Sequence, residues 1–227
     1  MIVGIENQGV SGRAVITGPV GSGKTVMTRR FGEDLQRALD GRRRLILAHV
    51  NCRNHPTASQ VLQEVARSLD SGQPERGFSS SEVMQSIRRN LEAHDAHLML
   101  VLDEVDVLIR NDKGDLIYKL LRIDEGQNQQ GSLSIILVSQ NTSLIKLFEP
   151  AIISRLGESN MLTLGGYGER ALNDIARQRY EKACRPGSVD DEALAKIGRF
   201  SAETGDARLA IEPVSYTHLT LPTILLV

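Results

Sequence analysis

The residues best suited to chemistry lie near the start of the chain, in the stretch GPVGSGKT. This stretch fits the phosphate-binding pattern G-x-x-x-x-G-K-[ST], in which glycines let backbone N–H groups surround phosphate oxygens. The lysine of such a loop reaches the β- and γ-phosphates of a nucleotide, and the hydroxyl that follows it is a ligand for Mg²⁺. We therefore predict that ATP or ADP and Mg²⁺ bind at Gly18, Pro19, Val20, Gly21, Ser22, Gly23, Lys24, Thr25 and Val26.

A pair of consecutive carboxylates supplies the second half of such a site. Asp103 and Glu104 follow the apolar run LMLVL, which is typical of a buried strand. A carboxylate at the end of that strand can hold Mg²⁺, and its neighbour can polarise an attacking water. We predict that Asp103 is a metal ligand and that Glu104 is catalytic.

The elements that must position these residues follow from the apolar patterning. Runs rich in Val, Ile and Leu predict buried strands at residues 13–18, 44–51, 98–106 and 133–141, with a short fifth strand at 160–164. Stretches with helical spacing separate them, at 26–39, 58–69, 82–91 and 116–123. Strands that alternate with helices predict an α/β fold, a parallel five-stranded sheet between helices. The glycine loop then lies between a strand and a helix, as a phosphate-binding loop requires.

The strand signal ends after residue 164, and helical segments follow at 169–182, 190–200 and from 206 onward. We therefore predict two domains, a nucleotide-binding domain over residues 1–165 and a small all-α lid over 166–213. The charge balance of 27 basic and 28 acidic residues gives a net charge of −1, so the chain as a whole is not attracted to nucleic acid or to an anionic membrane. With two cysteines and no apolar run near the ~20 residues of a membrane span, we expect a reducing, cytoplasmic location and no membrane partner.

A complete strand separates the phosphate loop from the acidic pair, and in this order the sequence resembles the AAA+ ATPases. Within that class it resembles the archaeal initiators of the origin-recognition/cell-division-control (ORC/CDC) family. The segments that carry the likeness are HVNCRN at 49–54, VLDEVDVL around Asp103, YKLLRIDE at 118–125, EPAIISRLGE at 149–158 and GDARLAIE from 205. Together they tie nearly all of residues 1–212 to the family.

The resemblance implies further site residues. Arg155 matches the arginine finger that acts on a neighbouring subunit's nucleotide, and Arg208 matches the second sensor, which reaches the γ-phosphate of its own subunit. Each is alternatively a surface arginine in a solvated ion pair. Tyr167 matches a nucleotide-binding position. Gln140 stands where the family has the asparagine of its first sensor, and Asn141 takes that place after a one-residue slip.

The function that the resemblance implies is an ATP-dependent DNA replication initiator, and the departure at Gln140 leads us to expect slow ATPase activity. Its expected partners are origin DNA, the replicative helicase and, through Arg155, further copies of itself, which implies a nucleoid-associated protein. The loop at 74–83, with Arg76, is either a DNA-backbone contact or a solvated loop. Two other functions remain open: an AAA+ regulator of a transposase or DNA-repair complex, and a nucleotide-gated switch with little turnover.

The last residues do not continue the pattern. VSYTHLTLPT, at 214–223, matches one translated reading frame of a widely used transposase sequencing adaptor. We therefore expect residues 214–227 to be a non-native tail that stands in place of the family's DNA-binding winged-helix domain. On this hypothesis the present segment binds nucleotide better than DNA.

Overall fold

The structure is a computed structural model that describes residues 11–70, 78–123, 125 and 132–212. The predicted DNA contact at Arg76 and the predicted tail at 214–227 lie outside these residues. Contacts divide the chain into two units. The first unit comprises residues 1–17 and 24–163, and the second comprises residues 18–23 and 164–227.

The first unit is built on a five-stranded sheet in the order β2-β3-β4-β1-β5, and all four strand pairs are parallel. The predicted α/β fold, a parallel five-stranded sheet between helices, is therefore confirmed. Since parallel neighbours present their carboxyl ends at one edge, the segments that follow the strands meet there. The strands are β1 (Arg13–Thr17), β2 (Arg44–Asn51), β3 (Ala96–Asp103), β4 (Leu133–Ser139) and β5 (Met161–Thr163).

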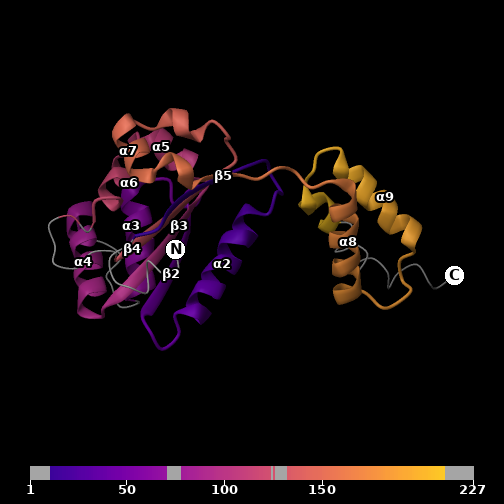
Figure 1. Ribbon diagram of the computed structural model, residues 1–227, viewed down its shortest axis with the longest axis horizontal. Helices are drawn as coiled ribbons and strands as arrows, with labels where there is room; N and C mark the ends of the chain where they lie inside the picture. The colour runs from indigo at the N-terminus through magenta and orange to yellow at the C-terminus, as the bar shows by residue number, and fades with distance from the viewer. Residues whose placement is uncertain (1–10, 71–77, 124, 126–131, 213–227) are drawn as a thin grey trace. The chain divides into compact units, whose positions relative to one another are not determined.

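Helices cover both faces of this sheet. All residues of β3 and β4 are buried, as expected of central strands with helices on each side. In Figure 1, α2 (Lys24–Ala38) runs along one side of the sheet, and α4 (Ser80–Ala93) lies on the other, next to α3 (Ala58–Leu69). Thr57 and Ser79 begin α3 and α4 with capping boxes, in which each hydroxyl accepts the N–H of the third helical residue.

The sequence missed several short helices. The predicted strand at 98–106 ends at Asp103, because Glu104 adopts a left-handed conformation that turns the chain into α5 (Val105–Asp112). The predicted helix at 116–123 is present as α6 (Asp115–Leu120), whereas η1 (Leu144–Leu147), α7 (Pro150–Leu156) and η2 (Glu158–Asn160) were not predicted. Among the described residues, no helix has both the length and the apolar character needed to cross a membrane.

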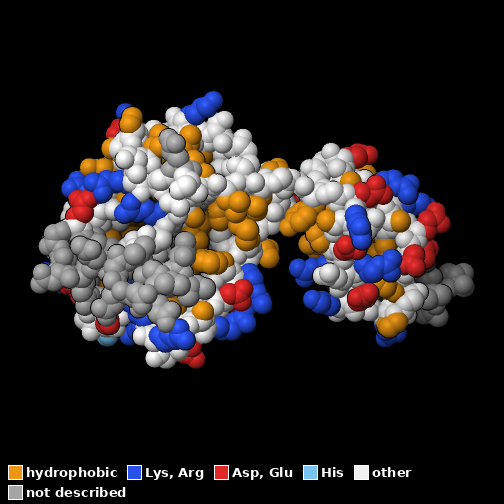
Figure 2. All heavy atoms as spheres, in the orientation of Figure 1, with side chains coloured by type: hydrophobic (Ala, Val, Ile, Leu, Met, Phe, Trp, Pro, Cys, Tyr) orange, Lys and Arg blue, Asp and Glu red, His pale blue; other side chains and the backbone are white. Residues whose placement is uncertain are grey.

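The described residues of the second unit are mainly helical beyond its loop segment. It contains α8 (Glu169–Ala183), α9 (Asp191–Ala202) and helical residues 207–212. These three pack around a small core of Leu172, Ala176, Leu194 and Ala210. Acidic and basic side chains are mixed over the face of this unit in Figure 2, and Arg177 pairs with Asp191 across the two long helices. The predicted domain limits at 165 and 213 stay predictions.

Candidate nucleotide-binding site

The predicted phosphate loop connects β1 to the first turn of α2. Gly18, Gly21 and Gly23 have φ values of 152°, 70° and 84°, a region that residues with a side chain rarely adopt. Ser22 stabilises the turn, since its hydroxyl donates to the carbonyl of Pro19 at 2.9 Å. The backbone N–H groups at the start of a helix such as α2 are a favourable site for an anion. The loop therefore has the conformation and the location that phosphate binding requires.

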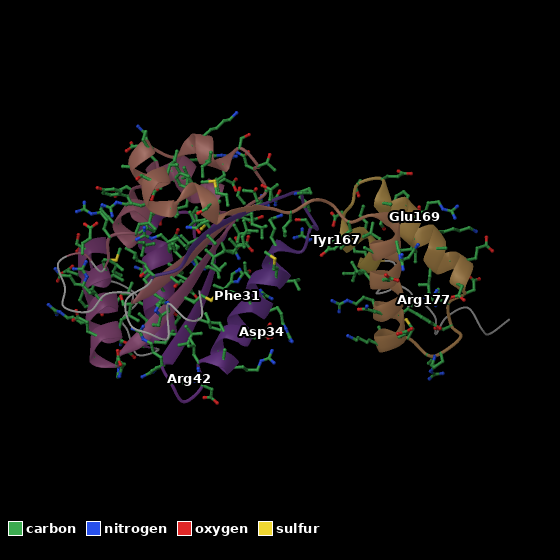
Figure 3. All side chains as sticks on the ribbon, viewed as in Figure 1. Phe31, Asp34, Arg42, Tyr167, Glu169 and Arg177 are labelled. Carbon is green, nitrogen blue, oxygen red and sulfur yellow. The ribbon has the colours of Figure 1, made fainter. Side chains whose placement is uncertain are left out.

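Other residues of the second unit pack closely against the glycines of the phosphate loop. A Cβ added at Gly23 would lie 2.6 Å from the Tyr167 hydroxyl, and one added at Gly21 would overlap the Asp206 side chain. Tyr167 comes from the segment that leads into α8 (Figure 3). The Arg208 N–H donates to the Asp206 carboxylate at 2.8 Å, and the Arg208 side chain is exposed. Tyr167 and Arg208, both predicted from the sequence, thus lie on segments that pack beside the loop.

Asp103 joins the end of β3 to the start of α2. One of its carboxylate oxygens, Oδ2, accepts the Thr25 hydroxyl at 2.7 Å and lies 3.4 Å from His49 Nε2. The other oxygen accepts the backbone N–H of Glu104 at 2.9 Å. A hydroxyl beside a carboxylate is an oxygen ligand pair of the kind that Mg²⁺ takes together with nucleotide phosphates and water. The two predicted metal ligands, Thr25 and Asp103, therefore fit that ion.

The surroundings of Asp103 also set its charge. Burial raises the pKa of this carboxyl, but hydrogen bonds from His49 and Thr25 outweigh burial and bring the pKa below its usual value. Asp103 is therefore ionised at neutral pH, which a metal ligand must be. Lys24, at the start of α2, is almost completely buried.

Glu104 is held from two sides in a strained conformation. Its φ and ψ are 53° and 41°, which for a residue with a side chain costs about 1–2 kcal/mol. Arg53 Nε lies 3.2 Å from one carboxylate oxygen, and the Gln140 amide donates to the other at 3.3 Å. Asn51 fixes the turn that carries Arg53, because the Asn51 side-chain oxygen accepts the backbone N–H of Arg53 at 2.8 Å. Both oxygens of the predicted catalytic carboxylate therefore have a partner.

The end of β4 distinguishes the two candidates for the first sensor. Gln140 reaches Glu104, whereas the side-chain oxygen of Asn141 accepts the N–H of Ser143 at 2.9 Å and shapes the turn. The last residue of β4 is also fixed, since the Ser139 hydroxyl donates to Asp106 at 2.8 Å. Of the two, Gln140 is the residue in contact with the predicted catalytic group.

Arg155 lies apart from these carboxylates. Its guanidinium pairs with Glu125 at 2.6 Å and lies over the Tyr118 ring, 5.6 Å from the ring centroid. The structure therefore does not bring Arg155 together with Asp103 or Glu104 of its own chain. An arginine finger that acts on the nucleotide of another subunit needs no contact with these carboxylates in its own chain.

Sequence reasoning missed two residues of the site. His49 lies on β2, two residues before Asn51, and Asn51 pairs with Asp103 in the parallel register. The side chains of His49 and Asp103 therefore lie on the same face of the sheet. Only the strand register reveals that His49 is a neighbour of Asp103. Arg53 was noted for the family likeness alone, and the turn after β2 brings it to Glu104. Cys52, between these two residues, is buried, and burial followed by the charge of Asp103 raises its pKa to about 12, so it stays an unreactive thiol.

A glycine loop that leads into a helix, with a hydroxyl bonded to a carboxylate at the end of a parallel strand, defines the class of P-loop nucleotide-binding proteins. The comparison with protein families narrows this class. The model of the AAA domain family matches residues 9–148, and the chain belongs to that family. The likeness to the AAA+ proteins that the sequence indicated is thus confirmed.

Individual relatives agree with the narrower resemblance to the archaeal ORC/CDC initiators. The chain is 29% identical over 201 residues to ORC1-type DNA replication protein 1 of Methanosarcina acetivorans, covering 87% of this chain and 48% of that protein. It is 32% identical over 213 residues to ORC1-type DNA replication protein 2 of Saccharolobus solfataricus, covering 90% and 51%. The chain thus spans about half the length of the curated relatives it matches.

A solved structure shares the fold over nearly the whole chain. The Aeropyrum pernix ORC1 protein, in complex with DNA, superposes with a TM-score of 0.84 at 26% identity, covering 96% of this chain and 56% of that one. The resemblance to the archaeal ORC/CDC initiators, first stated on sequence segments, is therefore confirmed.

We predict that His49→Leu raises the pKa of Asp103, because the variant loses a hydrogen bond that favours the charged carboxylate. A lowered pKa in the folded state stabilises the fold above the unfolded pKa, and this stability is lost as pH falls through the folded pKa. The variant should therefore be less stable than wild type at neutral pH, by a margin that shrinks in acid. Carboxyl ¹³C NMR titration measures the pKa, with His55→Leu as a control. An unchanged Asp103 pKa would contradict the assignment.

Proposed function

We propose that the chain is the nucleotide-binding portion of an ATP-dependent DNA replication initiator. The observation that carries the nucleotide site is the 2.7 Å hydrogen bond between Thr25 and Asp103, beside a loop whose glycines adopt φ values suited to phosphate. The replication role is supported by relatives named as ORC1-type DNA replication proteins, of which the chain spans about half.

Each residue of the site has a role in this proposal. The backbone of the loop from Gly18 to Gly23, with Val26 beyond it, surrounds the nucleotide, and the Lys24 ammonium contacts the β- and γ-phosphates. Thr25 and Asp103 would hold Mg²⁺, which when bound supplies positive charge to the phosphates. Glu104 orients and polarises the attacking water, with Gln140 beside it. In this proposal Tyr167 and Arg208 also contact nucleotide, and Arg155 acts on the nucleotide of another copy.

A nucleotide-gated switch with little turnover is a second candidate function, and one observation favours it. Glu104 must free an oxygen to polarise water, yet Arg53 and Gln140 each contact one of its two oxygens. A carboxylate whose two oxygens are both in contact with other side chains must give up one of these contacts before it can accept a water. The slow hydrolysis that the sequence predicts from Gln140 in the asparagine position remains part of this proposal.

The proposed partners follow from the relatives. The Aeropyrum pernix ORC1 protein was solved in complex with DNA, and we propose that the parent of this chain binds origin DNA, associates with the replicative helicase and self-associates through Arg155. Such a protein would work in the cytoplasm, at the nucleoid. No contact among the described residues favours a regulator of a transposase or DNA-repair complex.

Lys24→Ala should weaken ATP binding by roughly 10- to 150-fold, the amount that a hydrogen bond to a charged phosphate contributes. Isothermal titration of the chain with ATP and Mg²⁺ measures the change. Lys119→Ala is the matched control, because Lys119 is an exposed lysine paired with Asp115 at 2.6 Å. Equal affinities for wild type and the Lys24 variant would rule out the site assignment.

Glu104→Gln should leave ATP affinity unchanged and lower the single-turnover hydrolysis rate by about 100-fold or more, the usual contribution of general-base catalysis. Glu64→Gln is the control, since Glu64 pairs with Arg67 on the exposed face of α3. Wild-type turnover as slow as that of the Glu104 variant would instead favour the nucleotide-gated switch.

Chromatin immunoprecipitation of the full-length protein in its source organism tests the replication role. We expect enrichment at the sites where replication starts, and a loss of that enrichment in the Lys24→Ala variant. Enrichment at mobile elements or at damaged DNA in place of replication start sites would favour the regulator function over the initiator.

A further inference from the structure

Four side chains form a cluster on the first unit, which we call the Tyr118 cluster: Tyr118, Arg122, Glu125 and Arg155. Both guanidinium groups lie over the Tyr118 ring, 5.2 Å from its centroid for Arg122 and 5.6 Å for Arg155. Both also pair with the Glu125 carboxylate, Arg155 at 2.6 Å through Oε1 and Arg122 through Oε2. Arg122 donates in addition to the Tyr118 hydroxyl at 3.0 Å. One carboxylate therefore serves two cations.

The backbone at Arg155 is fixed more firmly than its side chain. Arg13, on the strand β1, donates to the carbonyl of Arg155, and the Asn160 side chain donates to the carbonyl of Leu156 at 2.7 Å. Leu156 itself is fully buried. The Arg155 side chain, in contrast, is 33% exposed, and Glu125 is 41% exposed. The end of α7 thus anchors Arg155, while its guanidinium lies at the surface in a pair that solvent screens.

Because Arg122 and Arg155 both pair with Glu125, the ion pair between Glu125 and Arg155 is replaceable. When Arg155 leaves, Glu125 keeps Arg122 as a counterion, so no carboxylate is left unpaired. Ion pairs at this level of exposure contribute little to stability. A phosphate carries more negative charge than a carboxylate and accepts two parallel N–H donors of a guanidinium, so it competes well for Arg155.

From this geometry we propose that Glu125 and Tyr118 form a latch that holds Arg155 on its own subunit until a second copy of the chain docks. Docking then transfers the Arg155 guanidinium from the Glu125 carboxylate to a phosphate oxygen of the nucleotide held in that second copy. The proposal rests on the proposed function, because it needs a nucleotide at Lys24 and Thr25 of the partner copy. Glu125 is a positioning residue in it, since it acts only through Arg155.

A mixing experiment isolates this transfer. Arg155→Ala chains keep an intact nucleotide site but supply no finger, whereas Lys24→Ala chains supply a finger but bind ATP too weakly to fill their own site at an ATP concentration that fills the Arg155→Ala site. Hydrolysis by the first, as increasing amounts of the second are added, reports Arg155 acting between copies. Adding Glu125→Gln to the Lys24→Ala donor should lower the half-maximal donor concentration by about two- to fivefold, the fold-change that matches an exposed ion pair.

Two further donors serve as controls. Glu64→Gln in the Lys24→Ala donor removes a carboxylate of similar exposure, 38%, and should change nothing. A donor that also carries Arg155→Ala should restore no hydrolysis. Melting temperatures of all donors establish that they are folded.

The outcomes separate the two proposals. An unchanged or raised half-maximal concentration with Glu125→Gln would overturn the latch, because Glu125 would then be idle or would orient Arg155 for its task. The absence of hydrolysis with every donor would overturn the transfer between copies. A wild-type chain that does not bind ATP at all, measured separately by titration, would overturn the proposed function and the latch with it.

Discussion

The hydrogen bond from the Thr25 hydroxyl to Asp103 is the contact on which the rest of the site depends. It joins the first turn of α2, which follows β1, to the end of β3. In the sheet, β4 lies between β1 and β3. A hydrogen bond to a buried carboxylate contributes about 1.5–3 kcal/mol, and it does so only if the sheet holds both ends in place. The parallel register of β3, β4 and β1 meets this requirement, since it brings their carboxyl ends to one edge.

The electrostatics of that edge follow from the same arrangement. Asp103, Glu104 and Asp106 lie within four positions of one another, and their mutual repulsion must be offset. Asp103 accepts hydrogen bonds from Thr25 and His49, and Glu104 pairs with Arg53. These partners come from the segments that follow β1 and β2 or from β2 itself. These contacts offset the repulsion at the acidic edge, and Asp103 keeps the charge that a metal ligand needs.

The difference between what could and could not be predicted from the sequence has a physical basis. The phosphate loop and the acidic pair are contiguous, so residue type and spacing were enough to identify them, and the apolar runs located all five strands. The helix α5 was missed because the apolar pattern continues past Asp103, and no pattern reveals that Glu104 adopts a left-handed conformation. His49 and Glu125 were missed because their partners, Asp103 and Arg155, are distant in the sequence. Strand register brings His49 to Asp103, and the packing of α7 brings Arg155 to Glu125.

The glycines of the phosphate loop meet two demands at once. Positive φ values at Gly21 and Gly23 already exclude most side chains, and in the second unit Asp206 and Tyr167 occupy the space where a Cβ would project. A substitution at either glycine would therefore disturb the loop twice, through backbone strain and through overlap with the Asp206 or Tyr167 side chain. Residues 18–23 belong to the same compact unit as these two side chains, and the Ala207 N–H donates to the Gly21 carbonyl at 3.4 Å. A change in the conformation of the loop is therefore transmitted directly to helical residues 207–212, and to Arg208 among them.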